Sequence, residues 1–187
     1  MIFEETRLAG AYVVDLDRKE DARGFFARAF CQKEFGEKGL ATVIAQANFA
    51  RNKRKGTVRG VHFQFPPHAE AKLVRCTRGA LLDVAVDLRP ESPTFLEHVA
   101  VELSADSGRA LYVPERFGHA YQALEDGTDV MYFASAPWAP GMDGGLSPFD
   151  RRLGLRWPAE VTEVSTKDRE WKPVAEVLEE LKQRMTR

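Results

Sequence analysis

The sequence has few cysteines, no long hydrophobic run and almost no net charge, and each of these absences excludes a class of protein. Its two cysteines, Cys31 and Cys76, match no metal-binding spacing, so we expect two free thiols. No apolar run approaches the roughly 18 residues that a membrane-spanning helix needs. The 27 basic and 28 acidic side chains give a net charge of −1, which disfavours nucleic-acid binding.

What is present is ordinary globular composition, with 44% hydrophobic and 29% charged residues among 187. The first ten residues carry charges and no apolar segment of the signal-peptide kind. We therefore expect one domain over residues 1–187, located in the cytoplasm.

Short apolar segments separated by Gly, Pro, Asp and Asn fill the chain from about residue 11 to residue 135. In residues 80–88 the apolar Val84 and Val86 alternate with Asp83 and Asp87, which predicts a half-buried strand. We expect further strands at 11–16, 42–49, 58–64, 72–77, 97–103, 110–113, 118–124 and 129–135, and one short helix near 31–38. This pattern indicates an all-β sandwich or barrel.

Only the last residues show helical spacing. An apolar stripe of Val174, Val177, Leu178, Leu181 and Met185 predicts a helix over about 173–185, which Pro173 would begin. The Pro- and Gly-rich segment 136–160 is expected to wrap the barrel as an ordered loop.

One of the four histidines, His62, stands out because it alternates with Gly60 and Gln64 along an expected strand. A sealed core would leave these polar groups unpaired, so the pattern favours a solvated cavity inside the barrel. His119 is expected to line the same cavity, and Lys72 begins the next strand after a Pro-Pro turn.

A metal site is the first alternative for histidines that line a barrel. Metal-binding barrels of the cupin type use His-x-His, a carboxylate and a distant third histidine. Gln64 occupies the second position of that motif, so Glu70 and His119 leave the set one imidazole short. We therefore expect no metal, which disfavours a metal-dependent oxygenase.

Without a metal, an imidazole, an ammonium and the phenol of Tyr132 suit proton abstraction next to a carbonyl. On pattern alone, a buried strand aromatic is the better interpretation of Tyr132. Arg23, Arg59 and the cluster RNKRK (51–55) are candidates for holding a diphosphate. A solvated hairpin turn explains residues 51–55 equally well.

Several motifs, in order, resemble the dTDP-4-dehydrorhamnose 3,5-epimerase family over about residues 10–170. They are DARGFF (21–26), QAN (46–48), GTVRGVHFQFPP (56–67), AKLVRCTRGALLDVAVDLRPESPTF (71–95), LYVPERFGHAY (111–121) and STKD (165–168). The resemblance implies a cupin-type double-stranded β-helix or jelly roll with a short C-terminal helix, which works without a metal or an organic cofactor. It also implies a homodimer that exchanges N-terminal strands, and a substrate of dTDP-4-dehydro-6-deoxy-D-glucose in the pathway to dTDP-L-rhamnose.

The resemblance also assigns roles by position. His62 resembles the general base, Asp168 the carboxylate that orients it, Tyr132 the acid on the opposite face, and Lys72 the group that stabilises the C4 enolate. Positions that bind the nucleotide and phosphates in the family are Arg23, Gln46, Asn48, Arg59, His119 and Lys167. Trp138 stands where the family stacks a tyrosine on thymine, and Asp143 where it has a glutamate.

The sequence departs from the family pattern in the expected nucleotide pocket. Arg28 replaces a glutamate, and Pro148-Phe149-Asp150 replaces Trp-Asn-Asp, as in some relatives from antibiotic deoxysugar pathways that invert only C3. Within the enzyme class, the alternatives are therefore inversion of one carbon only, or action on the 4-keto sugar of another nucleotide. A non-catalytic sugar-binding cupin is the alternative outside it; the retained His62, Tyr132 and Asp168 disfavour that alternative.

Overall fold

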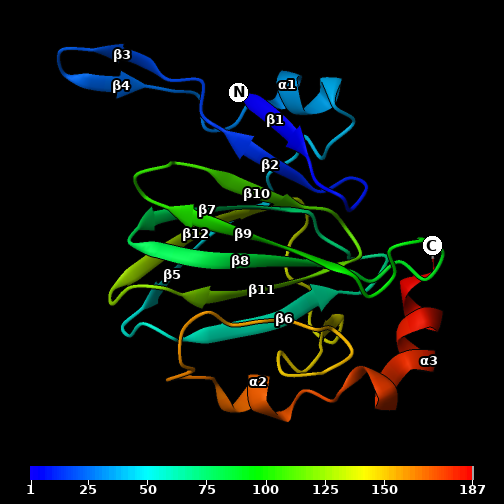
Figure 1. The fold of residues 1–187 in the computed structure, drawn as a ribbon. Helices are drawn as coiled ribbons and strands as arrows, with labels where there is room; N and C mark the ends of the chain where they lie inside the picture. Colours follow the sequence, from blue (N-terminus) through cyan, green and yellow to red (C-terminus); the bar gives the residue numbers. More distant parts are fainter. Residues whose placement is uncertain (187) are drawn as a thin grey trace.

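The computed structural model describes residues 1–186, and most of its strands form two antiparallel sheets (Figure 1). The six-stranded sheet has the order β1 (Ile2–Glu5), β2 (Tyr12–Asp15), β10 (Ala110–Val113), β7 (Lys72–Arg78), β12 (Thr128–Ala134) and β5 (Gln46–Asn52). The five-stranded sheet has the order β13 (Asp143–Gly145), β6 (Val58–Gln64), β11 (Phe117–Ala123), β8 (Ala80–Asp87) and β9 (His98–Ser104). The prediction of an all-β fold is confirmed.

The two sheets enclose an apolar core, and a second core lies outside the five-stranded sheet. The inner core includes Val74, Leu81, Ala85 and Leu111. The outer core places Val61, Phe63, Val84 and Val86 against Leu181 and Met185 of the C-terminal helix. β8 therefore contributes to both cores.

The strand predicted over residues 80–88 is confirmed as β8, but it is buried on both faces and not half-buried. Asp83 and Asp87 are both fully buried, as are Val84 and Val86 on the opposite face. The reason is that β8 lies between the inner core and the C-terminal segments. Its aspartates are held by protein partners instead of water: Asp87, for example, accepts hydrogen bonds from Arg89 and Thr94.

The N-terminal region contains two small elements beyond the sheets. The hairpin of β3 (Lys19–Asp21) and β4 (Gly24–Phe26) projects away from the body of the molecule (Figure 1). Its Phe25 and Phe26 side chains are 50% and 76% exposed. Helix α1 (Gln32–Glu37), within the predicted range, buries Phe35 against Tyr112 of the six-stranded sheet.

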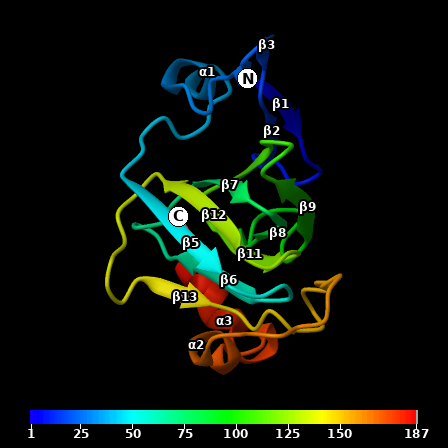
Figure 2. The ribbon, with the colours of Figure 1, turned by 90° about the vertical axis from the view of Figure 1, so that its left-hand side faces the viewer.

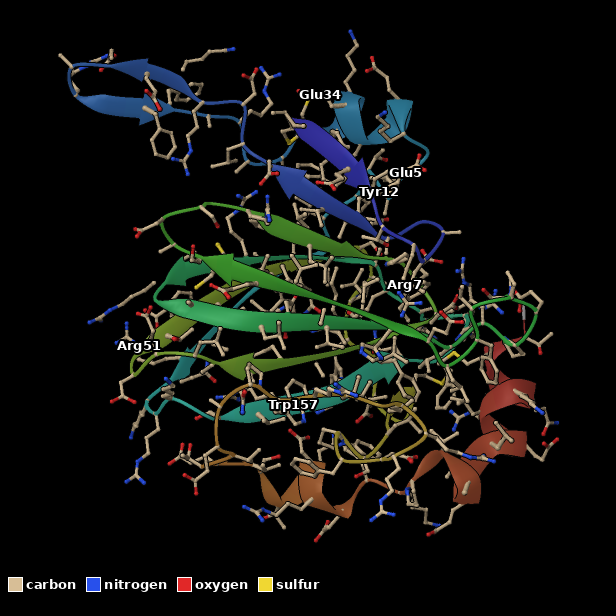
Figure 3. All side chains as sticks on the ribbon, viewed as in Figure 1. Glu5, Arg7, Tyr12, Glu34, Arg51 and Trp157 are labelled. Carbon is tan, nitrogen blue, oxygen red and sulfur yellow. The ribbon has the colours of Figure 1, made fainter. Side chains whose placement is uncertain are left out.

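The C-terminal helices α2 (Thr166–Glu170) and α3 (Val174–Met185) lie below the five-stranded sheet (Figures 1 and 2). The stripe predicted for α3 is confirmed, since Val174, Leu181 and Met185 are buried. Segment 136–160 is mostly loop, as predicted, and packs Leu146 and Leu153 into the outer core, but it also contains β13. Its far end is fixed by the Trp157 indole, labelled in Figure 3, which donates to the Pro148 carbonyl at 3.1 Å.

The strand predicted at 42–49 is displaced in the structure. β5 begins at Gln46, because its partner β12 ends at Ala134, and it continues to Asn52, which pairs with Thr128. Both cysteines are free, as predicted. None of the helices described is long and apolar enough to cross a membrane.

Candidate active site

A cavity of about 290 Å³ opens between the two sheets, next to α2. Its wall consists of Arg59, His62, Phe63, Gln64, Glu70, Lys72, Tyr132, Trp138, Asp143, Gly144, Ser165, Lys167, Asp168 and Trp171. The structure thus brings together the four predicted catalytic residues from four elements: β6, β7, β12 and α2.

His62 and Asp168 form the closest polar pair of this group. His62 Nε2 lies 2.6 Å from Asp168 Oδ1, and the Gly60 amide donates to Asp168 Oδ2 at 3.3 Å. Burial opposes ionisation of Asp168, but the hydrogen bonds from His62 and Gly60 outweigh it and lower the pKa of the carboxyl. An ionised Asp168 fixes the ring orientation of His62 and stabilises its protonated form, leaving Nδ1 free to act on a substrate.

Local structure explains how Asp168 reaches β6. Ser165 begins α2, and its hydroxyl accepts a hydrogen bond from the Asp168 amide at 3.0 Å. At Gly60, whose φ is +126°, a Cβ atom would lie 2.4 Å from the Ala120 side chain and 2.7 Å from the His119 carbonyl. Only glycine allows β6 and β11 to approach so closely.

On the opposite wall, Lys72 lies between Glu70 and Tyr132. Its Nζ is 3.1 Å from Glu70 Oε1 and 5.9 Å from the centre of the Tyr132 ring. Burial and the negative charge of Glu70 raise the pKa of Tyr132, against the effect of Arg59, so the phenol keeps its proton at neutral pH. Glu70, weighed from the sequence only as a metal ligand, is therefore a cavity residue that pairs with Lys72.

The mouth of the cavity holds Trp138, whose side chain is 60% exposed. Two glutamines fix the loop that carries it: Gln46 Oε1 accepts from the Trp138 amide and Gln64 Oε1 from the Ala139 amide, each at 2.7 Å. Gln64, whose place in the His-x-His motif disfavoured a metal site, thus positions this loop. Asp143 and Lys167 are joined across the mouth by an ion pair of 2.7 Å.

Asn48 and Arg59 come from strands of the two different sheets, β5 and β6. Asn48 shares a face of β5 with Gln46 and stands opposite Tyr132 in the β5–β12 register. Arg59 lines the cavity from β6. Trp171, which sequence reasoning missed, lines it as well, with Lys167 Nζ 5.4 Å from the indole ring.

Four predicted site residues do not line the cavity: Gln46 and Asn48 lie beside it on β5, and His119 and Arg23 are not brought to it. His119 is buried, with Nε2 2.7 Å from Asp83 Oδ1, and is not among the cavity-lining residues. Arg23 lies on the β3–β4 hairpin and pairs there with Asp21 at 2.6 Å.

In the basic cluster 51–55, Arg51 and Asn52 end β5, and only residues 53–55 form the solvated turn that the sequence left open as an alternative. Its Arg51 pairs with Asp129 at 2.7 Å, and none of its residues lines the cavity. Arg28, which reverses a charge relative to the family, pairs with Glu34.

Chemically, the cavity offers a carboxylate-supported imidazole on one side and an ammonium beside a protonated phenol on the other. This set can remove a proton next to a carbonyl, stabilise the enolate and return a proton. Among residues 1–186, no three His, Cys, Asp or Glu side chains are grouped to hold a metal ion.

Comparison with known proteins assigns the chain to a family. The family model for dTDP-4-dehydrorhamnose 3,5-epimerase matches residues 5–176. The Sinorhizobium fredii protein of that name is 40% identical over 90% of this chain and 87% of its own. A dTDP-4-dehydrorhamnose 3-epimerase of Streptomyces niveus is 35% identical over 87% of this chain and 79% of its own.

Among solved structures, a dTDP-4-dehydrorhamnose 3,5-epimerase from Elizabethkingia anophelis superimposes with a TM-score of 0.91. The two chains are 32% identical, and the match covers 94% of this chain and 97% of the other. This likeness confirms the predicted cupin-type jelly roll. By sequence and by structure, the chain belongs to the dTDP-4-dehydrorhamnose 3,5-epimerase family.

Proposed function

We propose that the protein epimerises C3 and C5 of dTDP-4-dehydro-6-deoxy-D-glucose, giving dTDP-4-dehydro-L-rhamnose for dTDP-rhamnose biosynthesis. The observation that carries this proposal is the single cavity in which the His62–Asp168 pair faces Lys72 and Tyr132. A sugar-binding module without catalysis has no use for a base and an acid together.

In the proposed mechanism, His62 removes the proton from C3, which the neighbouring 4-keto group acidifies. Asp168 stabilises the imidazolium that forms, and Lys72 stabilises the enolate oxygen at C4. Tyr132, whose raised pKa keeps it protonated, donates a proton to the opposite face of the carbon. Once His62 has released its proton to solvent and Tyr132 has regained one from solvent, the same steps at C5 complete the double inversion. No metal or organic cofactor takes part in these steps.

For substrate binding, we assign the pyrimidine to Trp138 at the mouth, because an exposed indole offers a stacking surface. Arg59 at the cavity and Arg23 are the proposed diphosphate contacts, and Gln46, Asn48, His119, Asp143 and Lys167 complete the proposed nucleotide site. His119 would act there only after leaving its buried pair with Asp83.

We also propose that the protein is a homodimer that exchanges its N-terminal strands, and that it acts in the cytoplasm. The exposed β3–β4 hairpin supports the exchange, because it carries Phe25, Phe26 and Arg23 away from the body of its own chain. Exposed aromatic side chains of this kind are typical of an interaction surface. Arg23 would then act in the partner's cavity.

Inversion of C3 alone is the second candidate. The similarity to a 3-epimerase from Streptomyces niveus favours it, as does segment 148–150, whose residues depart from the family pattern. Incubating the protein with dTDP-4-dehydro-6-deoxy-D-glucose and assigning the product by NMR distinguishes the candidates. Inversion at both carbons supports the main proposal, inversion at C3 supports the second, and unchanged substrate refutes both.

A further inference from the structure

Asn52 is a buried polar residue at the end of β5, one side chain away from the cavity. Its side chain is 1% exposed, and it shares the inward face of β5 with Gln46 and Asn48. After Asn52 the chain leaves the six-stranded sheet and, from Val58, enters the five-stranded one. The residue therefore stands where the two walls of the cavity meet.

The hydrogen bonds of Asn52 fix which way its amide points. Its Nδ2 donates to the Thr128 carbonyl at 3.1 Å, which only the nitrogen end can do. Its Oδ1 accepts from Arg59 Nε at 2.9 Å and from the Tyr121 hydroxyl at 3.3 Å. Burial raises the pKa of Tyr121 to about 12, so this hydroxyl keeps its proton and remains a donor.

The Arg59 guanidinium is consequently held by hydrogen bonds on the side away from the cavity. Besides the bond from Nε to Asn52, its Nη2 donates to the Arg51 carbonyl at 3.3 Å. Within the described residues, these bonds use two of the five donors of the guanidinium. The remaining donors are free for a ligand in the cavity that Arg59 lines.

We infer that Asn52 is a positioning residue, which holds the Arg59 guanidinium toward the diphosphate of the substrate. Asn52 itself touches no substrate; it acts by fixing one torsionally flexible arginine in the orientation that binds an anion bidentately. The inference rests on the proposed function, since it needs a diphosphate at Arg59.

A double-mutant cycle tests the inference by comparing a ligand that carries the diphosphate, dTDP, with one that lacks it, thymidine. Affinities for dTDP and for thymidine are measured by calorimetry with wild-type protein, Asn52→Leu, Arg59→Ala and the double variant. Because a hydrogen bond to a charged group is lost, Asn52→Leu should weaken dTDP binding about tenfold, with thymidine binding unchanged. In the Arg59→Ala background, Asn52→Leu should have almost no further effect on dTDP binding.

The matched control is Tyr121→Phe, which removes the other donor to the same Oδ1 and leaves the Arg59 bond in place. It should change neither affinity. If Asn52→Leu does not fold, Asn52→Ser replaces it, because the serine side chain is one bond shorter and loses the contact with Arg59. With substrate, the KM of the Asn52 variant should rise more than its kcat falls.

Equal losses of dTDP affinity in the wild-type and Arg59→Ala backgrounds would overturn the role of Asn52, as would equal losses for dTDP and thymidine. An active wild-type enzyme with either result leaves the proposed function intact. A wild-type protein that neither binds dTDP nor changes the nucleotide sugar overturns the proposed function, and the Asn52 role with it.

Discussion

His62 Nε2 and Asp168 Oδ1 lie 2.6 Å apart although 106 residues separate them in the chain. One residue comes from β6 and the other from the first turn of α2, where Ser165 holds the Asp168 amide. The pair faces Tyr132 across one cavity. This arrangement leads to predictions for the base, the acid, the stacking residue and the assembly.

Replacing His62 by alanine should lower turnover about 10²- to 10⁴-fold, the usual contribution of a positioned general base. Asp168→Asn should lower it strongly but less, since the base remains. Steady-state assays with the nucleotide sugar measure both effects. His98→Ala, which changes a histidine on β9 outside the cavity, serves as the control and should retain activity. Near-normal proton exchange in His62→Ala would show that another group is the base.

The raised pKa of Tyr132 predicts the alkaline side of the pH profile. Its phenol stays protonated up to and beyond the ordinary value of 10.0, so the acid is lost only as pH rises through the higher folded-state value. Rates of inverted-product formation should therefore show no loss due to Tyr132 between pH 7 and about pH 10. A phenolate absorbance change with a midpoint below pH 10 that is present in the wild-type protein and absent from Tyr132→Phe would contradict this assignment.

Trp138→Ala should weaken dTDP binding by about 0.5–1.5 kcal/mol in addition to the free energy lost with the contact area. The rate of proton transfer should be largely unaffected. Calorimetric titration with dTDP measures the change. Trp138→Phe keeps an aromatic face and should recover most of the affinity. If the alanine variant binds dTDP as the wild type does, Trp138 packs the loop and does not stack on the base.

Light scattering should report a dimer of about 42 kDa, twice the chain mass of 21.0 kDa. Arg23→Ala should preserve the dimer and raise the KM for the nucleotide sugar, because a diphosphate contact is lost. Lys19→Ala on the same hairpin is the matched control. A stable monomer with full activity would leave Arg23 without its proposed role.

The sequence alone predicts the parts of the site that follow a local pattern. Alternation along one strand places Gly60, His62 and Gln64 on one face, and β6 has that arrangement. The pairing of His62 with Asp168 came only from the family resemblance, because no local rule connects residues so far apart.

The parts that the sequence could not predict depend on distant packing. Asp83 is buried, with His119 paired to it, because the face of β8 that also carries Leu81 and Ala85 packs toward the six-stranded sheet, and no pattern within residues 80–88 predicts which sheet covers that face. β13 escapes prediction because its pairing relies on two glycines: a Cβ atom at Gly144 or Gly145 would collide with Phe63 or Trp171. Such a segment has no alternation of side chains from which a strand could be predicted.

The central claim is that His62 and Tyr132 exchange protons on opposite faces of C3 and C5, and labelling in heavy water tests it most directly. The wild-type protein should place deuterium at C3 and C5 of inverted product. Tyr132→Phe should still wash deuterium into C3 but yield no inverted product. Wild-type protein that labels C3 and never C5 would contradict the double inversion and make the protein a 3-epimerase, and the absence of label at either carbon would contradict the mechanism itself.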